Sequence, residues 1–249
     1  MDTRRPSSLK SPWLIGFGLV AVAQLASVAL GLPLSGFVTW LLAPLLAVWV
    51  WGEQGPKLLV LVLMFFCAGD ILGNPAMIGV GRIGLFLSVA AFAVANVLLI
   101  ILLVSTRARP TKPTPIGGSL RWRGGVAVLF LIPAAMGLAL TWGNLSPVLR
   151  LVGSLYLLLL VVTATTAFVV DICTGLGAAL LFSSHLLVVL EVGGRIDGTG
   201  TVFRLAVLAL YTLGILLIAA GIVNQGLRTK PRRHDGTRAS RPRRRQEGS

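Results

Sequence analysis

The chain has 249 residues, of which 55% are hydrophobic and only 12% are charged, so it lacks the charged surface that keeps a soluble domain in water. Its formal net charge of +14 would fit a nucleic-acid-binding protein. The distribution of charge excludes that class, because the basic residues gather beside apolar stretches. In such places they orient membrane helices or contact anionic lipid headgroups.

Eight apolar stretches follow one another, each near the roughly 20 residues that cross a bilayer core of about 30 Å. We predict membrane helices over residues 13–31, 36–52, 57–73, 82–104, 125–142, 148–170, 174–191 and 202–224. The first stretch is longer than the apolar core of a signal peptide, so we expect it to be retained. Mostly short connections predict an all-α, polytopic membrane bundle of about eight transmembrane helices.

Composition divides the chain into three regions. Residues 1–12 form a basic N-terminus, and residues 13–225 form the transmembrane domain. Residues 226–249 are rich in Arg, Pro, Ser and Gly and lack the apolar residues that a folded unit needs. We therefore predict a disordered, basic tail.

The positive charges predict which ends of the helices face the cytoplasm. With the N-terminus inside, eighteen of the 22 basic residues fall on the cytoplasmic side. The other side receives only Arg82, Arg150, Arg195 and Arg204. We therefore expect both termini in the cytoplasm of a multi-pass protein of a bacterial-type plasma membrane, with anionic headgroups as candidate partners of the tail.

Two further patterns predict no cofactor and no metal site. Residues 79–84 match the dinucleotide fingerprint GxGxxG, but that motif binds only between a strand and a helix, and here it precedes a membrane helix. The two cysteines, Cys67 and Cys173, are too few for a disulfide framework or a zinc site.

Polar side chains inside the predicted spans are the candidates for chemistry, because they are costly in lipid and normally face the bundle interior. Asp70 lies late in the third span and His185 midway along the seventh. Each has a structural interpretation, as a hydrogen-bonding group between helices. The alternative is a buried pair that handles protons, since a carboxyl group in a low-dielectric cavity suits a general acid and histidine titrates near neutrality. Asn96, in the fourth span, is a poorer partner by depth.

Four segments resemble, in the right order, the motifs of the YhhN family of lysoplasmalogenase-type membrane proteins. Residues 66–72 (FCAGDIL) look like its "GD" third helix, and residues 90–96 (AAFAVAN) are similar to its G-x-F-x-x-x-H helix. Residues 177–185 (GAALLFSSH) resemble its G-A-x-L-F-x-x-S-[DN] helix, and residues 211–218 follow its last span. The resemblance covers the second to the eighth span.

The resemblance implies a lipid substrate and hydrolysis of the alkenyl ether bond of lysoplasmalogens. No metal cluster is visible in the sequence, so we expect a mechanism without a cofactor. The resemblance carries over Asp70 as the first acidic residue. The chain departs from the family where Asn96 replaces a histidine, where His185 replaces a second aspartate, and at Ala43 and Ile215, where the family has polar residues. We predict that Asp70 and His185 are catalytic and divide the acid and base roles. The polar residues predicted to contact the substrate are Asn96, Tyr156 and Tyr211.

Two other functions fit the sequence. A small-solute transporter predicts broken helices that meet at the midplane. A non-catalytic family member or membrane scaffold predicts that Asp70 and His185 point to different faces of the bundle. The hydrolase predicts that both face one cavity.

Overall fold

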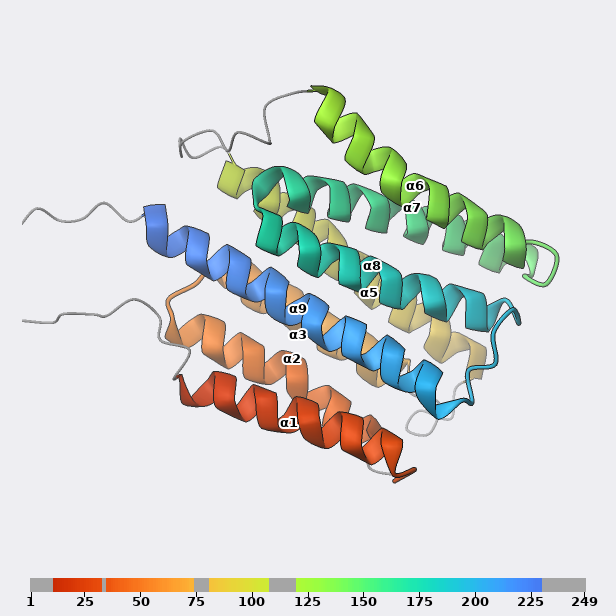
Figure 1. Cartoon of the computed structure of the whole chain (residues 1–249), viewed down its shortest axis with the longest axis horizontal. Coiled ribbons are helices and arrows are strands. Elements are labelled where there is room, and N and C mark those ends of the chain that lie inside the picture. The colour runs from red at the N-terminus through yellow and green to blue at the C-terminus, as the bar shows by residue number, and fades with distance from the viewer. Residues whose placement is uncertain (1–10, 33–34, 74–80, 108–119, 230–249) are drawn as a thin grey trace, which may run out of the picture.

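The computed structural model describes residues 11–32, 35–73, 81–107 and 120–229, and all regular structure within them is helical (Figure 1). The predicted all-α class is confirmed. The helices are α1 (Pro12–Ala29), α2 (Ser35–Gly52), α3 (Lys57–Leu72), α5 (Gly81–Arg107), α6 (Leu120–Thr141), α7 (Pro147–Val170), α8 (Ile172–Val192) and α9 (Thr201–Thr229).

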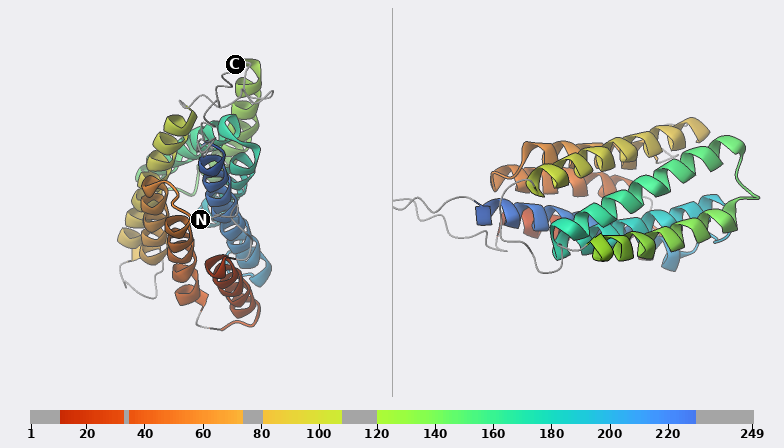
Figure 2. Two further views of the ribbon diagram at one scale, coloured as in Figure 1. Left: turned by 90° about the vertical axis from the view of Figure 1, so that its left-hand side faces the viewer. Right: turned by 90° about the horizontal axis from the view of Figure 1, so that it is seen from above.

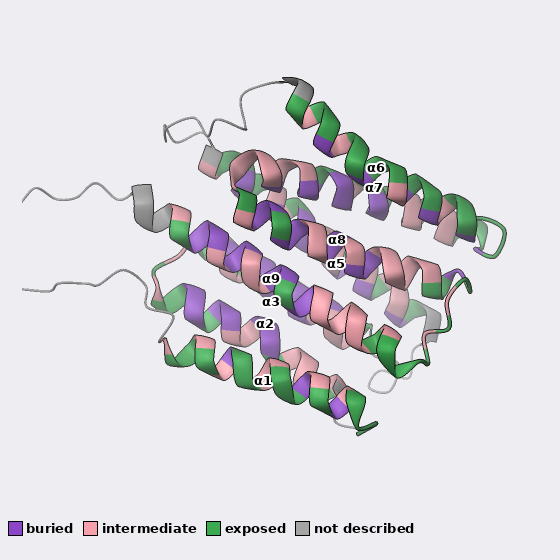
Figure 3. Cartoon of the chain, viewed as in Figure 1, coloured by how far each residue is buried: buried purple, intermediate pink, exposed green. Residues whose placement is uncertain are grey.

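The helices have the length and the outward-facing apolar surface of membrane spans. Six of those in the described part of the chain, α1 and α5 to α9, are long and apolar enough to cross a bilayer, and α2 adds a shorter apolar helix over Gly36–Gly52. Large apolar side chains are exposed on their outer faces, for example Leu19 at 67% and Leu129 at 65%. Exposed residues are especially dense on α1 and α6 (Figure 3). Such a surface would cause association in water and is satisfied by lipid, so the chain is a multi-pass membrane protein.

Seven helices contact one another in a closed series that surrounds an interior. The series runs α1, α2, α3, α5, α7, α8, α9 and returns to α1, while α6 packs outside it against α7 and α8. The two further views show α2, α3 and α5 on one side of the bundle and α9 and α8 on the other (Figure 2). The start of α1 and the end of α9 lie at the same end of the bundle (Figure 1).

Glycines bring α8 and α9 into close backbone contact. A Cβ atom at Gly177 would lie 2.7 Å from the carbonyl oxygen of Gly214, and one at Gly214 would lie 2.9 Å from the carbonyl oxygen of Gly177. Both distances are too short for a side chain, so only glycine permits this approach. In lipid, where the hydrophobic effect does not drive helix association, such close packing does. It fixes the rotation of the helices that carry His185 and Tyr211.

A sharp turn at Asp171 sets the direction of α8. The residue is extended (φ −162°, ψ 143°) and is all that separates α7 from α8. Its Oδ2 accepts hydrogen bonds from the backbone N–H of Thr174 at 3.1 Å and from the Thr174 hydroxyl at 3.4 Å. These bonds satisfy a free donor of the first helical turn, as an N-cap does.

The observed helices differ from the predicted spans mainly at their polar ends. α5 continues to Arg107, α6 begins at Leu120 and α9 continues to Thr229. The hydropathy pattern marks where lipid contact ends, whereas backbone hydrogen bonds extend a helix into the headgroup region. The predictions for the N-terminus and the tail concern mostly residues 1–10 and 230–249, which lie outside the described residues.

Candidate active site

A cavity of about 280 Å³ lies in the interior, between α3, α5, α7, α8 and α9. Most of its wall is apolar, and its polar side chains come from all five of these helices. The polar residues that line it are Asp70, Ser88, Tyr156, Ser184, His185 and Tyr211. An apolar cavity with a few convergent polar groups is the usual form of a small-molecule site. This one suits a largely apolar molecule that carries a polar group.

Asp70 reaches the cavity from the last turn of α3. Its Oδ2 accepts a hydrogen bond from the hydroxyl of Tyr211, on α9, at 2.7 Å. The chain approaches α5 closely here, because a Cβ atom at the neighbouring Gly69 would lie 2.8 Å from the ring of Phe92. The bond to Tyr211 fixes the orientation of the carboxyl group, so that Oδ1 is the oxygen available to a molecule in the cavity.

His185 faces the same cavity from α8. Its Nδ1 lies 2.8 Å from the carbonyl oxygen of Leu181, one turn earlier in the helix. A carbonyl oxygen only accepts, so the neutral ring carries its proton on Nδ1 and keeps the lone pair of Nε2 for another partner. This tautomer makes Nε2 a candidate base.

Three aromatic rings pack around the imidazole. The ring centroid of His185 lies 5.2 Å from that of Phe92, 5.7 Å from that of Tyr156 and 6.3 Å from that of Tyr211. Tyr211 therefore bonds to Asp70 through its hydroxyl and contacts His185 through its ring. The two predicted catalytic residues are brought together around one tyrosine.

Of the residues predicted to contact the substrate, Tyr156 lies on the cavity wall and Asn96 does not. Tyr156 lines the cavity, and its buried hydroxyl has no hydrogen-bond partner among the described residues, so it is available to a ligand. Asn96 is fully buried outside the cavity lining, and its Nδ2 donates to the carbonyl oxygen of Phe92 at 2.8 Å. A direct substrate contact by Asn96 stays a prediction from the family motif.

Two wall residues were missed by the reasoning from sequence. Phe92 contacts His185, Tyr211 and Phe66. Ser88, one turn earlier in α5, donates its hydroxyl hydrogen to the carbonyl oxygen of Gly69 at 2.7 Å. Helical spacing was the available signal, because both residues lie on one face of α5, four positions apart.

The other departures from the family motifs lie in the packed core rather than in the cavity. Ala43 is fully buried in α2, and Ile215 is 1% exposed, one turn beyond Tyr211 in α9. Apolar side chains at these positions fill helix contacts. Of the four departures, His185 alone lines the cavity.

The described residues contain no group of three or more His, Cys, Asp or Glu side chains placed to hold a metal ion. Both cysteines are free thiols, and neither lines the cavity.

Comparison with known proteins identifies one relationship. The model of the YhhN family matches residues 34–222, which include every residue that lines the cavity. No curated protein and no solved structure matches the chain.

Proposed function

The chain belongs to the YhhN family, and on that premise we propose that it hydrolyses the alkenyl ether bond of lysoplasmalogen-type lipids inside this cavity. The observation that carries the proposal is the placement of Asp70 and His185 on one apolar cavity, with Tyr211 between them. The membrane character of the chain supports a substrate that enters from lipid. A bacterial-type plasma membrane, with both termini in the cytoplasm, is part of the same proposal.

In the first step Asp70, in its protonated form, transfers a proton from Oδ1 to the ether's outer alkenyl carbon. The carbon–carbon double bond supplies the electron pair, which leaves an oxocarbenium ion at the carbon that bears the ether oxygen. The Asp70 carboxylate that remains stabilises this cation across the cavity. The hydroxyl of Tyr211 keeps its hydrogen bond to Oδ2 throughout and so holds the acid in position.

In the second step water attacks the cationic carbon while Nε2 of His185 accepts its proton, which gives a hemiacetal. The imidazolium then protonates the glycerol oxygen as the carbon–oxygen bond breaks, and the hemiacetal hydroxyl returns its proton to Asp70. The products are a fatty aldehyde and a glycerophospho-base, one water is consumed, and both side chains recover their starting states. General acid and base groups of this kind each contribute about 10²- to 10⁴-fold.

The test is aldehyde release from lysoplasmalogen by the full chain in detergent. We expect wild-type protein to release aldehyde and Asp70→Asn and His185→Ala to release none, with unchanged melting temperatures. The matched controls are Asp197→Asn, in the exposed loop before α9, and His234→Ala, the other histidine, and both should keep wild-type activity. Failure of wild-type protein to release aldehyde from choline and ethanolamine forms would refute the reaction and favour a non-catalytic scaffold or a transporter.

A further inference from the structure

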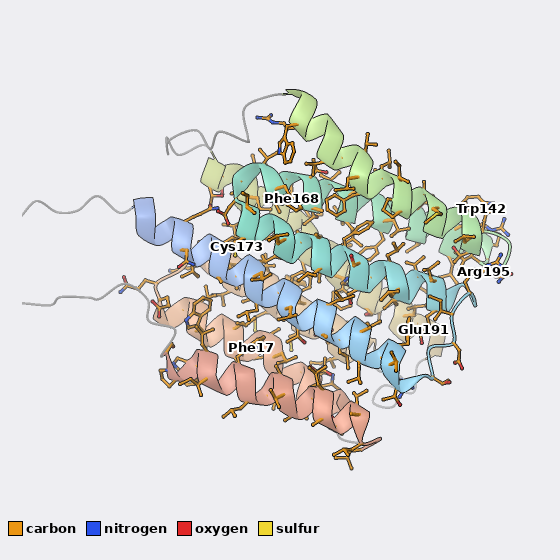
Figure 4. The ribbon with its side chains drawn as sticks, in the orientation of Figure 1. Phe17, Trp142, Phe168, Cys173, Glu191 and Arg195 are labelled. Atoms are coloured by element: carbon orange, nitrogen blue, oxygen red, sulfur yellow. The ribbon has the colours of Figure 1, made fainter. Side chains whose placement is uncertain are left out.

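A second hollow, of about 550 Å³, opens at the end of the bundle away from the start of α1. It lies between the last residues of α1 and α8 and the first residues of α2 and α9. Its wall includes Gly31, Glu191, Gly198, Phe203 and Arg204. Figure 4 shows Glu191 at this end of the bundle together with Arg195 and Trp142. Tryptophan and charged side chains are typical of the level of lipid headgroups.

The hollow adjoins the inner cavity. Gly73, at the end of α3, and Val207 and Leu208, on α9, line both spaces. Along α8, Glu191 is six residues beyond His185, a rise of about 9 Å at 1.5 Å per residue. Along α9, Arg204 is seven residues before Tyr211, a rise of about 10 Å. One molecule can therefore reach from the candidate catalytic groups to both charged side chains.

Glu191 and Arg204 place opposite charges on either side of Gly198. The Nε of Arg204 donates to the carbonyl oxygen of Gly198 at 3.2 Å, and the carboxylate of Glu191 lies where a side chain at Gly198 would stand. Neither charge forms an ion pair with any side chain that the structure describes. Both are therefore available to a ligand that carries a negative and a positive group.

We infer that this hollow binds the headgroup of the lipid as a zwitterion, with Arg204 on the phosphate and Glu191 on a primary ammonium. The identity of the lipid rests on the proposed function. Arginine suits the phosphate because its planar guanidinium donates parallel hydrogen bonds to two oxygens. The apolar cavity then takes the alkenyl chain, and the ether bond lies between the two spaces, beside Asp70.

The wall of the hollow favours ethanolamine over choline. Proteins bind quaternary ammonium groups within cages of several aromatic rings. Of the described residues that line the hollow, only Phe203 is aromatic. A primary ammonium can instead donate hydrogen bonds to the Glu191 carboxylate, which a trimethylated nitrogen cannot.

The experiment measures binding of alkyl-ether lipids, which have no alkenyl bond and are not hydrolysed by the proposed reaction. The probes are alkyl-glycerophosphoethanolamine, its choline counterpart, and alkylglycerol without a phosphate, each titrated into the full chain in detergent. Arg204→Gln should weaken both phospholipids about three- to tenfold and leave alkylglycerol unchanged. Glu191→Gln should weaken the ethanolamine lipid by a similar factor and the choline lipid less. Arg195→Gln is the matched control, because Arg195 is a basic residue at the same end that does not line the hollow.

The binding inference and the proposed reaction fail separately. Three outcomes would overturn the headgroup site. Arg204→Gln could bind the phospholipids as tightly as wild type does, it could lose as much affinity for alkylglycerol as for the phospholipids, or wild type could bind none of the three lipids. If the rate of aldehyde release from alkenyl lipids did not depend on the headgroup, the reaction would be supported and the headgroup site would not. If binding depended on the headgroup but no aldehyde were released, the headgroup site would be supported and the reaction would not.

Discussion

The hydroxyl of Tyr211 donates a hydrogen bond to Oδ2 of Asp70 at 2.7 Å, although 141 positions of the chain separate the two residues. The bond crosses the interior from α9 to α3 and lies on the wall of the cavity. The same tyrosine ring contacts His185. One side chain thus positions both groups of the proposed acid–base pair. Removing its hydroxyl tests how much the positioning of Asp70 contributes to the rate, because the acid and the base themselves remain.

We expect Tyr211→Phe to lower kcat for aldehyde release about ten- to a hundredfold with little change in KM. The ring remains and continues to pack against His185. The Asp70 carboxylate that develops as the proton is transferred loses a hydrogen bond to a charged group, worth about 1.5–3 kcal/mol in the transition state. Steady-state kinetics on wild type and variant measure the effect. An unchanged kcat in a variant with a wild-type melting temperature would show that the hydroxyl does not position Asp70.

His185→Asn tests the histidine as a base. The asparagine amide can replace the Nδ1 donor to the carbonyl oxygen of Leu181, but it has no basic nitrogen. We expect kcat to fall about 10²- to 10⁴-fold, while the affinity for an alkyl-ether lysolipid changes by less than about threefold. Single-turnover aldehyde release and binding titrations distinguish the two quantities. If the variant still released aldehyde at a substantial rate, a group other than His185 would have to accept the proton from the attacking water.

The fold was predictable because lipid imposes a simple length rule. Runs of apolar residues gave spans whose ends agree with the observed helices within a few residues along most of the chain. The larger differences, at Leu120 and Thr229, fall where polar residues continue a helix beyond the bilayer core. Hydropathy contains no information on that continuation.

The site was predictable in part. Asp70 and His185 stood out because ionisable side chains are rare inside apolar helices. Their common cavity depends on the rotation of five helices, which glycine contacts such as Gly177 with Gly214 determine. Spacing along one chain does not define that rotation, so neither the partnership of Tyr211 with Asp70 nor the place of Asn96 outside the wall could be derived.

Gln24 links three helices through buried polar contacts, and its loss should destabilise the bundle. The residue is fully buried in α1, its Nε2 donates to Thr39 Oγ1 at 2.7 Å, and its Oε1 accepts from Thr212 Oγ1 at 3.4 Å. Gln24→Leu keeps a similar volume and removes both bonds, so we expect a loss of about 1 kcal/mol in unfolding free energy. Denaturation in detergent measures it. A double-mutant cycle with Thr212→Val should show that the two losses are not additive, whereas strict additivity would argue against the shared contact.

Gly214→Ala should separate α8 from α9 and thereby damage both stability and the site. A Cβ atom there would lie 2.9 Å from the carbonyl oxygen of Gly177 and 3.0 Å from the backbone nitrogen of Leu181, and backbone cannot yield as a flexible side chain does. Overpacking of this kind costs about 1–3 kcal/mol. Since His185 and Tyr211 are on these two helices, we also expect a lower kcat. Thermal unfolding in detergent and aldehyde release measure the two effects.

The matched control is Gly18→Ala on α1, where a Cβ atom would meet nothing within 4 Å. Alanine is the better helix former, so this variant should be as stable as wild type or more so. If Gly214→Ala were equally harmless, the α8–α9 contact would tolerate a methyl group. The precise rotation of His185 toward Tyr211 would then have to come from the aromatic contacts around the imidazole instead.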